Sequence, residues 1–247
     1  MRHRALIAVF VAALVVTAGC GAIGDGGGGQ QATTQSPEDA RPVSERVADA
    51  TAGVQTYGVD FRMKLTANGE TLQLTQVGVY DRASERARLN MSVYGTPATA
   101  YVDGETMYVE AGGQWQRQDL AGSGVWGENG TLARQRALLD VGEVSEAGTE
   151  TVDGVETTVY EVDADPAAFE SLLSQGAQTG QATLTIQNAS YRLYVADDTD
   201  RPRKAELSTT VTTQGQTARA NVTILFSDYG EPVSVTIPDA APANDST

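Results

Sequence analysis

The chain lacks most of the side chains on which enzymes depend. Its 247 residues include one histidine, His3, and one cysteine, Cys20, and both lie within the first 20 residues. A Ser-His-Asp triad, a Cys-His pair and a histidine zinc site all need groups that the rest of the chain does not contain. A phosphate-binding loop and a dinucleotide fingerprint are missing as well. These gaps predict a protein that is not an enzyme and has no cofactor or metal.

Carboxylates are the one catalytic group left. Two closely spaced pairs have the residue type that a glycoside hydrolase uses, Asp163 with Asp165 and Glu143 with Glu146. The chain has 32 acidic residues, so such pairs arise by chance. The acidic turn at residues 197–200 lacks the glycine and the terminal glutamate of an EF-hand calcium loop. A solvated hairpin turn is the favoured interpretation.

Positive charge is also scarce. Only 17 lysines and arginines stand against the 32 acidic residues, and Lys64 and Lys204 are the two lysines. A surface rich in Asp and Glu stays hydrated when salt shortens the Debye length to about 3 Å. The composition is therefore typical of proteins from high-salt organisms. Its sign argues against nucleic acid as a partner, because phosphates demand a positive face.

Long apolar runs are limited to residues 5–16, which follow Arg2 and Arg4. This run is shorter than the roughly 20 residues of a membrane-spanning helix. A basic start, an apolar core, small residues and then the thiol of Cys20 form the pattern of a lipoprotein signal peptide. We expect residues 1–19 to be removed and lipid on Cys20 to anchor the protein on the extracytoplasmic face of the membrane. The alternative is an uncleaved anchor with an incidental cysteine.

Composition divides the rest of the chain into three parts. Residues 20–35 contain Cys20 and a run of four glycines, which predicts a flexible tether. Residues 36–238 are long enough for one β-rich domain with a substantial core. Residues 239–247 are polar and predict a disordered tail. Removal of Arg2 and Arg4 leaves 15 of the 17 basic residues in the mature chain, a net charge of −17.

Alternation of apolar and polar residues dominates the domain. Residues 57–65, 87–93 and 218–226 alternate over their whole length, as half-buried strands do. The apolar phase slips by one residue between Leu74 and Val77, and Gly78 beside the slip predicts a β-bulge. Turns are expected at Asp103-Gly104 and Asp153-Gly154. Further strands are expected at residues 184–186, 191–195, 205–211 and 233–237, for about ten or eleven in all.

Three helices are expected between the strands. The first begins after Pro42, where Val43 and Val47 start an apolar stripe that reaches residue 54. The second covers residues 132–139. The third begins at Asp165-Pro166, a capping residue followed by proline at the first helical position. Strands in runs with helices between them predict an α+β fold with an antiparallel sheet.

Asparagine is used in an unusual way. Five of the six asparagines begin Asn-X-Ser/Thr, the acceptor sequence for N-glycosylation: Asn90, Asn129, Asn188, Asn221 and Asn244. The polar phase of the predicted strands includes Asn90 and Asn221, where a glycan is tolerated. The alternative for any single site is that a threonine-rich β-protein produces such sequences by chance.

Three features support a family resemblance: Cys20 with its tether, the hairpin at residues 101–109 with Trp115 beyond it, and the ending at residues 226–238. With these features the chain resembles a group of haloarchaeal surface lipoproteins of unknown function. More distantly it resembles the bacterial lipoprotein-localisation carrier (LolA-like) and the glycolipid-binding lipoproteins of mycobacteria. The resemblance implies a strongly curved antiparallel sheet, a half-open β-barrel covered by two or three helices that encloses an apolar cavity for acyl chains. It supplies no catalytic residues.

Trp115 and Trp126 flank a glycine-rich stretch. These tryptophans are candidates for the rim of a ligand site, although Trp115 in the core with a plain loop beside it is the favoured alternative. The leading hypothesis for function is non-catalytic binding of a hydrophobic or lipid-like ligand in the concave face of the sheet. The alternative is an envelope interaction protein with a solid core. A connected apolar cavity of several hundred Å³ favours the first hypothesis and a filled core favours the second.

Overall fold

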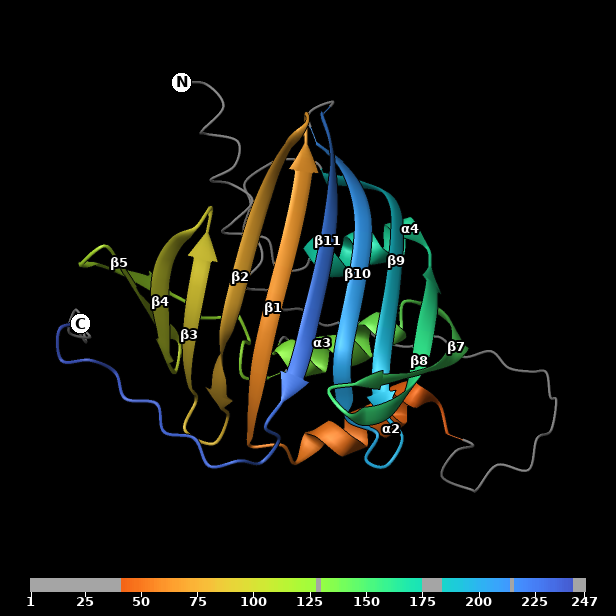
Figure 1. Ribbon diagram of the computed structural model, residues 1–247, viewed down its shortest axis with the longest axis horizontal. Coiled ribbons are helices and arrows are strands. Elements are labelled where there is room, and N and C mark those ends of the chain that lie inside the picture. Colours follow the sequence, from red (N-terminus) through yellow and green to blue (C-terminus); the bar gives the residue numbers. More distant parts are fainter. Residues whose placement is uncertain (1–40, 128–129, 175–183, 214–215, 242–247) are drawn as a thin grey trace.

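A computed structural model of the chain describes residues 41–127, 130–174, 184–213 and 216–241 (Figure 1). The predicted signal peptide, Cys20 and most of the predicted tail lie outside the described residues, as do Asn129 and Asn244.

One antiparallel sheet of eleven strands forms the body of the protein. Its strand order is β6-β5-β4-β3-β2-β1-β11-β10-β9-β8-β7. The first and last strands of the described chain, β1 and β11, pair in the middle, so two meandering halves meet there. The strands are β1 (Thr56–Ala67), β2 (Glu70–Asp81), β3 (Arg86–Val93), β4 (Thr96–Asp103), β5 (Thr106–Ala111), β6 (Gln114–Asp119), β7 (Gly142–Val152), β8 (Val155–Ala164), β9 (Leu184–Ala196), β10 (Pro202–Thr213) and β11 (Gln216–Ser227).

Three helices lie on one face of the curved sheet (Figure 1). They are α2 (Val43–Ala52), α3 (Thr131–Leu139) and α4 (Pro166–Ser174). We call the face that carries them the inner face and the opposite one the outer face. The Asp165 carboxylate accepts hydrogen bonds from the backbone N–H groups of Ala167 at 2.7 Å and Ala168 at 3.3 Å, so the predicted cap of α4 forms. The predicted α+β architecture, an open curved antiparallel sheet with helices on one side, is confirmed.

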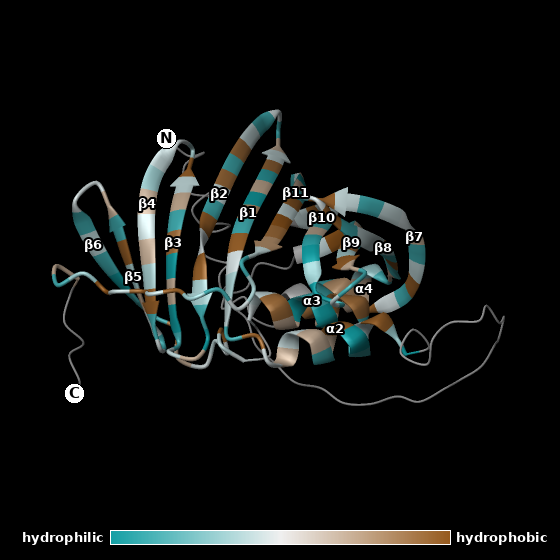
Figure 2. Cartoon of the chain, turned by 60° about the horizontal axis from the view of Figure 1, so that its bottom comes forward, coloured by the Kyte–Doolittle hydropathy of each residue, from teal (hydrophilic) through white to brown (hydrophobic). Residues whose placement is uncertain are grey.

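The main core lies between the helices and the inner face. Alternate residues of the strands point into it, which gives the banded pattern of apolar and polar residues in Figure 2. Val47 of α2, Leu139 of α3 and Phe169 of α4 are each at most 2% exposed and pack with inner-face side chains such as Tyr191 and Phe226. This part of the inner face is filled by protein. Among the described residues, no helix is long and apolar enough to cross a membrane.

The bulge expected at Gly78 is wrong. β2 pairs with both of its neighbours without a register shift. Gly78 lies opposite Val59 of β1 on one side and opposite Leu89 of β3 on the other. A Cβ atom at position 78 would lie 2.1 Å from the backbone oxygen of Arg88, so glycine permits a close approach of β3 instead. The apparent slip arises because Val77 faces outward and is 50% exposed.

Two strand assignments also change. Residues 184–196 form one strand, because pairing with β10 continues through the polar middle. The register shifts there between Thr210 and Val211, and once more between Pro202 and Lys204. Residues 233–237 are not a strand. Both edges of β11 are already occupied, by β1 and β10, and the chain after Ser227 runs past β2 and β3 toward β5 (Figures 1 and 2). The expected turns at Asp103-Gly104 and Asp153-Gly154 are confirmed.

The sheet bends most at its β7 end. The register of β7 and β8 shifts between Glu146 and Gly148, and Gly148 has φ of 125°, a backbone conformation that favours glycine. The hairpin therefore folds over the outer face (Figure 1), where Val152, Val159 and Tyr194 form a small cluster of their own. This bend produces part of the curvature that the resemblance implied.

Candidate functional site

A pocket of about 140 Å³ lies where α2, α3 and the start of β1 meet on the inner face. Its apolar lining comes from both helices, from β1 and from the loop before α3: Ala48, Ala52, Tyr57, Val125, Leu132 and Ala133. Two arginines, Arg82 and Arg136, also line it. Small side chains on the facing helices leave this space open. The pocket is therefore a product of alanines on two helices that are about 80 residues apart in the chain.

Aromatic rings form the sheet side of this site. Tyr57 and Tyr80 stack with ring centroids 5.0 Å apart and planes 5° apart, and the Trp126 ring meets Tyr80 edge-on at 6.2 Å. Burial raises the pKa of both tyrosine hydroxyls, so these groups stay protonated near neutral pH. The Thr131 hydroxyl at the start of α3 lies within hydrogen-bonding reach of both. These aromatic side chains therefore make the sheet side of the site uncharged, with both apolar rings and polar hydroxyl groups.

Trp126 is fixed in place. Its indole Nε1–H donates a hydrogen bond of 2.7 Å to the backbone oxygen of Gly104, in the turn between β4 and β5. Its chain neighbours Val125 and Gly127 line the pocket. The loop that carries Trp126 is thus held against the sheet next to the site, in the region where a rim was predicted.

Trp115 lies elsewhere. It belongs to the edge strand β6 and is half-buried, with its ring 6.1 Å from that of Tyr101 on the outer face. The structure therefore separates the two predicted rim residues, and Trp115 is not part of the main core either. β6 is the last strand of its half of the sheet and lies away from the three helices that cover the main core (Figure 2).

Two arginines outside the strands, Arg82 just after β2 and Arg201 just before β10, hold the C-terminal end of α2. Arg82 donates through Nη1 to the backbone oxygens of Thr51 at 3.3 Å and Val54 at 2.9 Å. Arg201 donates through Nε to the Ala50 oxygen at 3.4 Å. The last turn of α2 has no basic residue of its own, so these two guanidinium groups supply the positive charge that the negative end of a helix favours.

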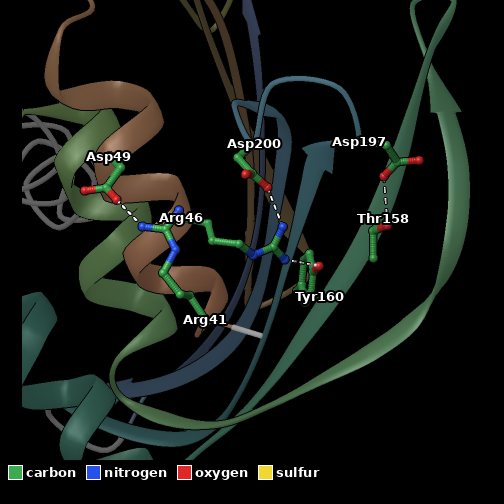
Figure 3. A network of polar contacts seen from close by, with 7 residues as sticks. All are labelled: Arg41, Arg46, Asp49, Thr158, Tyr160, Asp197 and Asp200. Atoms are coloured by element: carbon green, nitrogen blue, oxygen red, sulfur yellow. Dashed lines mark hydrogen bonds and ion pairs between the residues drawn. The ribbon is translucent and has the colours of Figure 1, made fainter. Parts of the chain in front are cut away.

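A polar network holds the other end of the same helix (Figure 3). The Arg46 guanidinium forms an ion pair with Asp200 and donates a 2.7 Å hydrogen bond to the Tyr160 hydroxyl. The neighbouring Asp197 carboxylate accepts a 2.8 Å hydrogen bond from Thr158. The predicted acidic turn is therefore tied to α2 and to β8. Among the described residues, no group of three potential metal ligands gathers there or elsewhere.

The other candidate residues do not gather at the pocket. The asparagines of the described sequons are exposed on the outer face, in strands β3, β9 and β11: Asn90, Asn188 and Asn221. The carboxylate pairs are exposed as well, with Glu143 directly opposite Asp163 across the β7–β8 ladder. None of these carboxylates lines the pocket.

Gln135 is a feature that sequence reasoning missed. It is 2% exposed in the middle of the core, accepts a 2.8 Å hydrogen bond from the Tyr191 hydroxyl and donates a 2.7 Å bond to the Thr131 oxygen. The signal that could have identified it is the presence of a glutamine within the apolar stripe of residues 132–139. Because its amide is satisfied within the protein, Gln135 positions α3 on the sheet.

The model of a family of unknown function, DUF7537, matches residues 5–240. The chain belongs to this family. The match includes residues 5–19 of the predicted signal peptide and the whole described sheet. No curated protein sequence matches the chain.

Solved structures are similar to this DUF7537 protein over most of its length. The lipoprotein LppX of Mycobacterium tuberculosis is 16% identical, with a TM-score of 0.55 over 78% of this chain and 96% of its own. LprF of Mycobacterium bovis is 18% identical, with a TM-score of 0.48 over 81% and 96% of the two chains. An outer membrane lipoprotein-sorting domain of Vibrio parahaemolyticus is 8% identical, with a TM-score of 0.27 over 78% and 92%. The similarity to LppX shows a common curved sheet with helices on one face.

Proposed function

We propose that this DUF7537 protein is a lipid-anchored protein of the extracytoplasmic membrane face that binds a hydrophobic or lipid-like ligand without catalysis. The observation that carries this proposal is the pocket of about 140 Å³ with its alanine, leucine and aromatic lining on the inner face. The fold shared with a mycobacterial lipoprotein supports it. The anchor is the predicted lipid on Cys20, and residues 20–35 form the tether.

The volume of the pocket limits the size of the group that can bind in it. An apolar cavity of roughly 150 Å³ holds one benzene-sized group. The present pocket therefore accepts one small apolar group or the first few carbons of a single chain, with the remainder of the ligand outside. Deeper entry requires α2 and α3 to separate. The Arg46 and Arg82 contacts oppose that movement because both hold α2 to the sheet.

The small volume of the pocket also favours a second function, in which the protein binds no ligand. Ligand pockets for whole lipids or drug-sized molecules have about 300–1,000 Å³, more than this pocket offers. The filled core around Val47, Leu139 and Phe169 agrees with an envelope interaction protein that has no ligand. In that case the outer face, with its exposed sequons, is the functional surface.

A pocket-filling variant separates the two functions. We expect the chain carrying Cys20→Ser to bind decanol, an uncharged single-chain amphiphile, and Ala133→Leu to weaken that binding at least about tenfold by occupying the space. Ala167→Leu, an exposed substitution on α4, is the matched control and leaves the affinity unchanged. Calorimetric titration measures both. Absence of decanol binding to the unsubstituted pocket favours the solid-core interaction protein.

A further inference from the structure

The pocket has a charged side that its apolar lining does not explain. Arg82 and Arg136 are both part of its wall, and the described lining contains no carboxylate. The chain as a whole has 32 acidic residues against 17 basic ones. Two arginines without an acidic partner in the wall are therefore an unusual local feature of this protein.

Arg82 has donors to spare. Its Nη1 donates to the Thr51 and Val54 oxygens, which fixes the guanidinium plane at the end of α2. Among the described residues, none accepts a hydrogen bond from its Nε or Nη2. A guanidinium carries five N–H donors in a rigid fork that matches the oxygens of a carboxylate or phosphate. Arg82 is thus positioned in advance, with donors left for a further acceptor.

Arg136 is the more accessible of the two. Its side chain is 57% exposed at the end of α3, and its Nε lies 3.6 Å from the Asp140 carboxylate. Exposed ion pairs of this kind contribute little to stability, so an incoming anion displaces the contact easily. Ala133 and Leu132, one turn or less away on the same helix, belong to the apolar part of the wall. Apolar and cationic groups thus meet at one site.

We propose, building on the function proposed above, that the ligand is a single-chain amphiphile with an anionic oxygen head group, carboxylate or phosphate. The first carbons of its chain lie against Ala48, Ala133 and Tyr57, and its head group accepts hydrogen bonds from Arg82 and Arg136. Short-range charge-assisted hydrogen bonds suit a high-salt environment, because screening removes the repulsion from distant carboxylates first.

Three probes separate the contribution of the anionic head group from that of the alkyl chain: decyl phosphate, decanol and inorganic phosphate. Each is titrated into the protein carrying Cys20→Ser. We expect decyl phosphate to bind about tenfold more tightly than decanol, since charge-assisted hydrogen bonds are the stronger kind. Arg136→Gln lowers the affinity for decyl phosphate more than the affinity for decanol and so removes most of that preference. The matched control is Arg117→Gln, an exposed arginine of the edge strand β6, which leaves both affinities unchanged.

The outcomes separate this inference from the function on which it depends. Equal affinity for decyl phosphate and decanol overturns the anionic head group and leaves the apolar site standing. Inorganic phosphate that binds as tightly as decyl phosphate also overturns the inference, because the site then recognises a free anion. If none of the three probes binds, the proposed function itself fails.

Discussion

Single arginines connect distant parts of the sequence. Arg46 of α2 contacts Tyr160 and Asp200, which lie 114 and 154 residues further along the chain. Its side chain is 13% exposed, so both contacts are shielded from water. Hydrogen bonds to charged groups in such places contribute more than exposed ion pairs do. The position of α2 over the sheet therefore depends on this residue.

Replacement of Arg46 by alanine tests that dependence. We expect Arg46→Ala to lower the free energy of unfolding by about 2 kcal/mol, because Asp200 and the Tyr160 hydroxyl lose a charged partner. Arg41→Ala removes the exposed pair with Asp49 and is expected to change it by less than about 0.5 kcal/mol. Urea denaturation at constant salt measures both. Equal losses in the two variants contradict the assigned role of Arg46.

Buried tyrosines predict a dependence of stability on alkaline pH. Burial raises the pKa of Tyr57, Tyr80 and Tyr191 above the ordinary value of 10.0. In the unfolded chain these hydroxyls ionise near that value, whereas in the folded chain they stay protonated. Their contribution is fully present below pH about 10 and is lost as the pH rises further.

Urea denaturation at a series of pH values tests whether stability falls as the pH rises. We expect the urea midpoint to fall between pH about 9.5 and 11.5, with phenolate absorbance appearing together with unfolding. Tyr57→Phe removes one of the groups and makes the fall shallower. Phenolate absorbance from these three tyrosines in the still folded protein speaks against their burial.

The helices and strands that local sequence patterns determine could be predicted, whereas those that depend on long-range contacts could not. Alternation identified most strands, and Asp165-Pro166 located the start of α4, because both depend on near neighbours in sequence. Residues 233–237 alternate equally well but cannot pair with the preceding strand, because β1 and β10 already occupy both sides of β11. The pocket escaped prediction for the same reason, since Ala48, Arg82 and Ala133 meet only after three separate elements have packed.

Substitution of Gly78 tests the close packing of β2 against β3. Gly78→Ala places a methyl group 2.1 Å from the Arg88 backbone oxygen, which forces β2 and β3 apart. We expect a loss of about 2 kcal/mol or more in the free energy of unfolding. Gly53→Ala, at the end of α2 with φ of −90° and no atom within 4 Å of the new carbon, is the matched control. It is expected to be neutral or slightly stabilising. A Gly78→Ala variant as stable as this control would contradict the close approach of β3.

The whole molecule has two faces of different character. The inner face carries the helices, the aromatic wall and the pocket, whereas the outer face presents the exposed asparagines of the described sequons. In the proposed function, in which lipid on Cys20 anchors the protein, glycans on the outer face would leave the inner face open to a ligand. One curved sheet separates the exposed asparagines from the pocket.

Glycan occupancy is the prediction for the outer face. We expect intact protein from its native host to lose one glycan mass in each of the variants Asn90→Gln, Asn188→Gln and Asn221→Gln. The matched control is Asn68→Gln, a turn asparagine outside any acceptor sequence, which changes the mass only by the substitution itself. Mass spectrometry of the purified proteins distinguishes these cases. An unmodified mass for all of them would assign the sequons to chance.

Native mass spectrometry tests ligand binding most directly. Protein extracted gently from its own host is compared with the Cys20→Ser chain, so that the anchor is distinguished from a bound molecule. We expect an apolar adduct in addition to the lipid on Cys20 and the glycans, and we expect Ala133→Leu to remove it. Protein that carries the anchor and the glycans but no further adduct would contradict ligand binding and support the solid-core interaction protein.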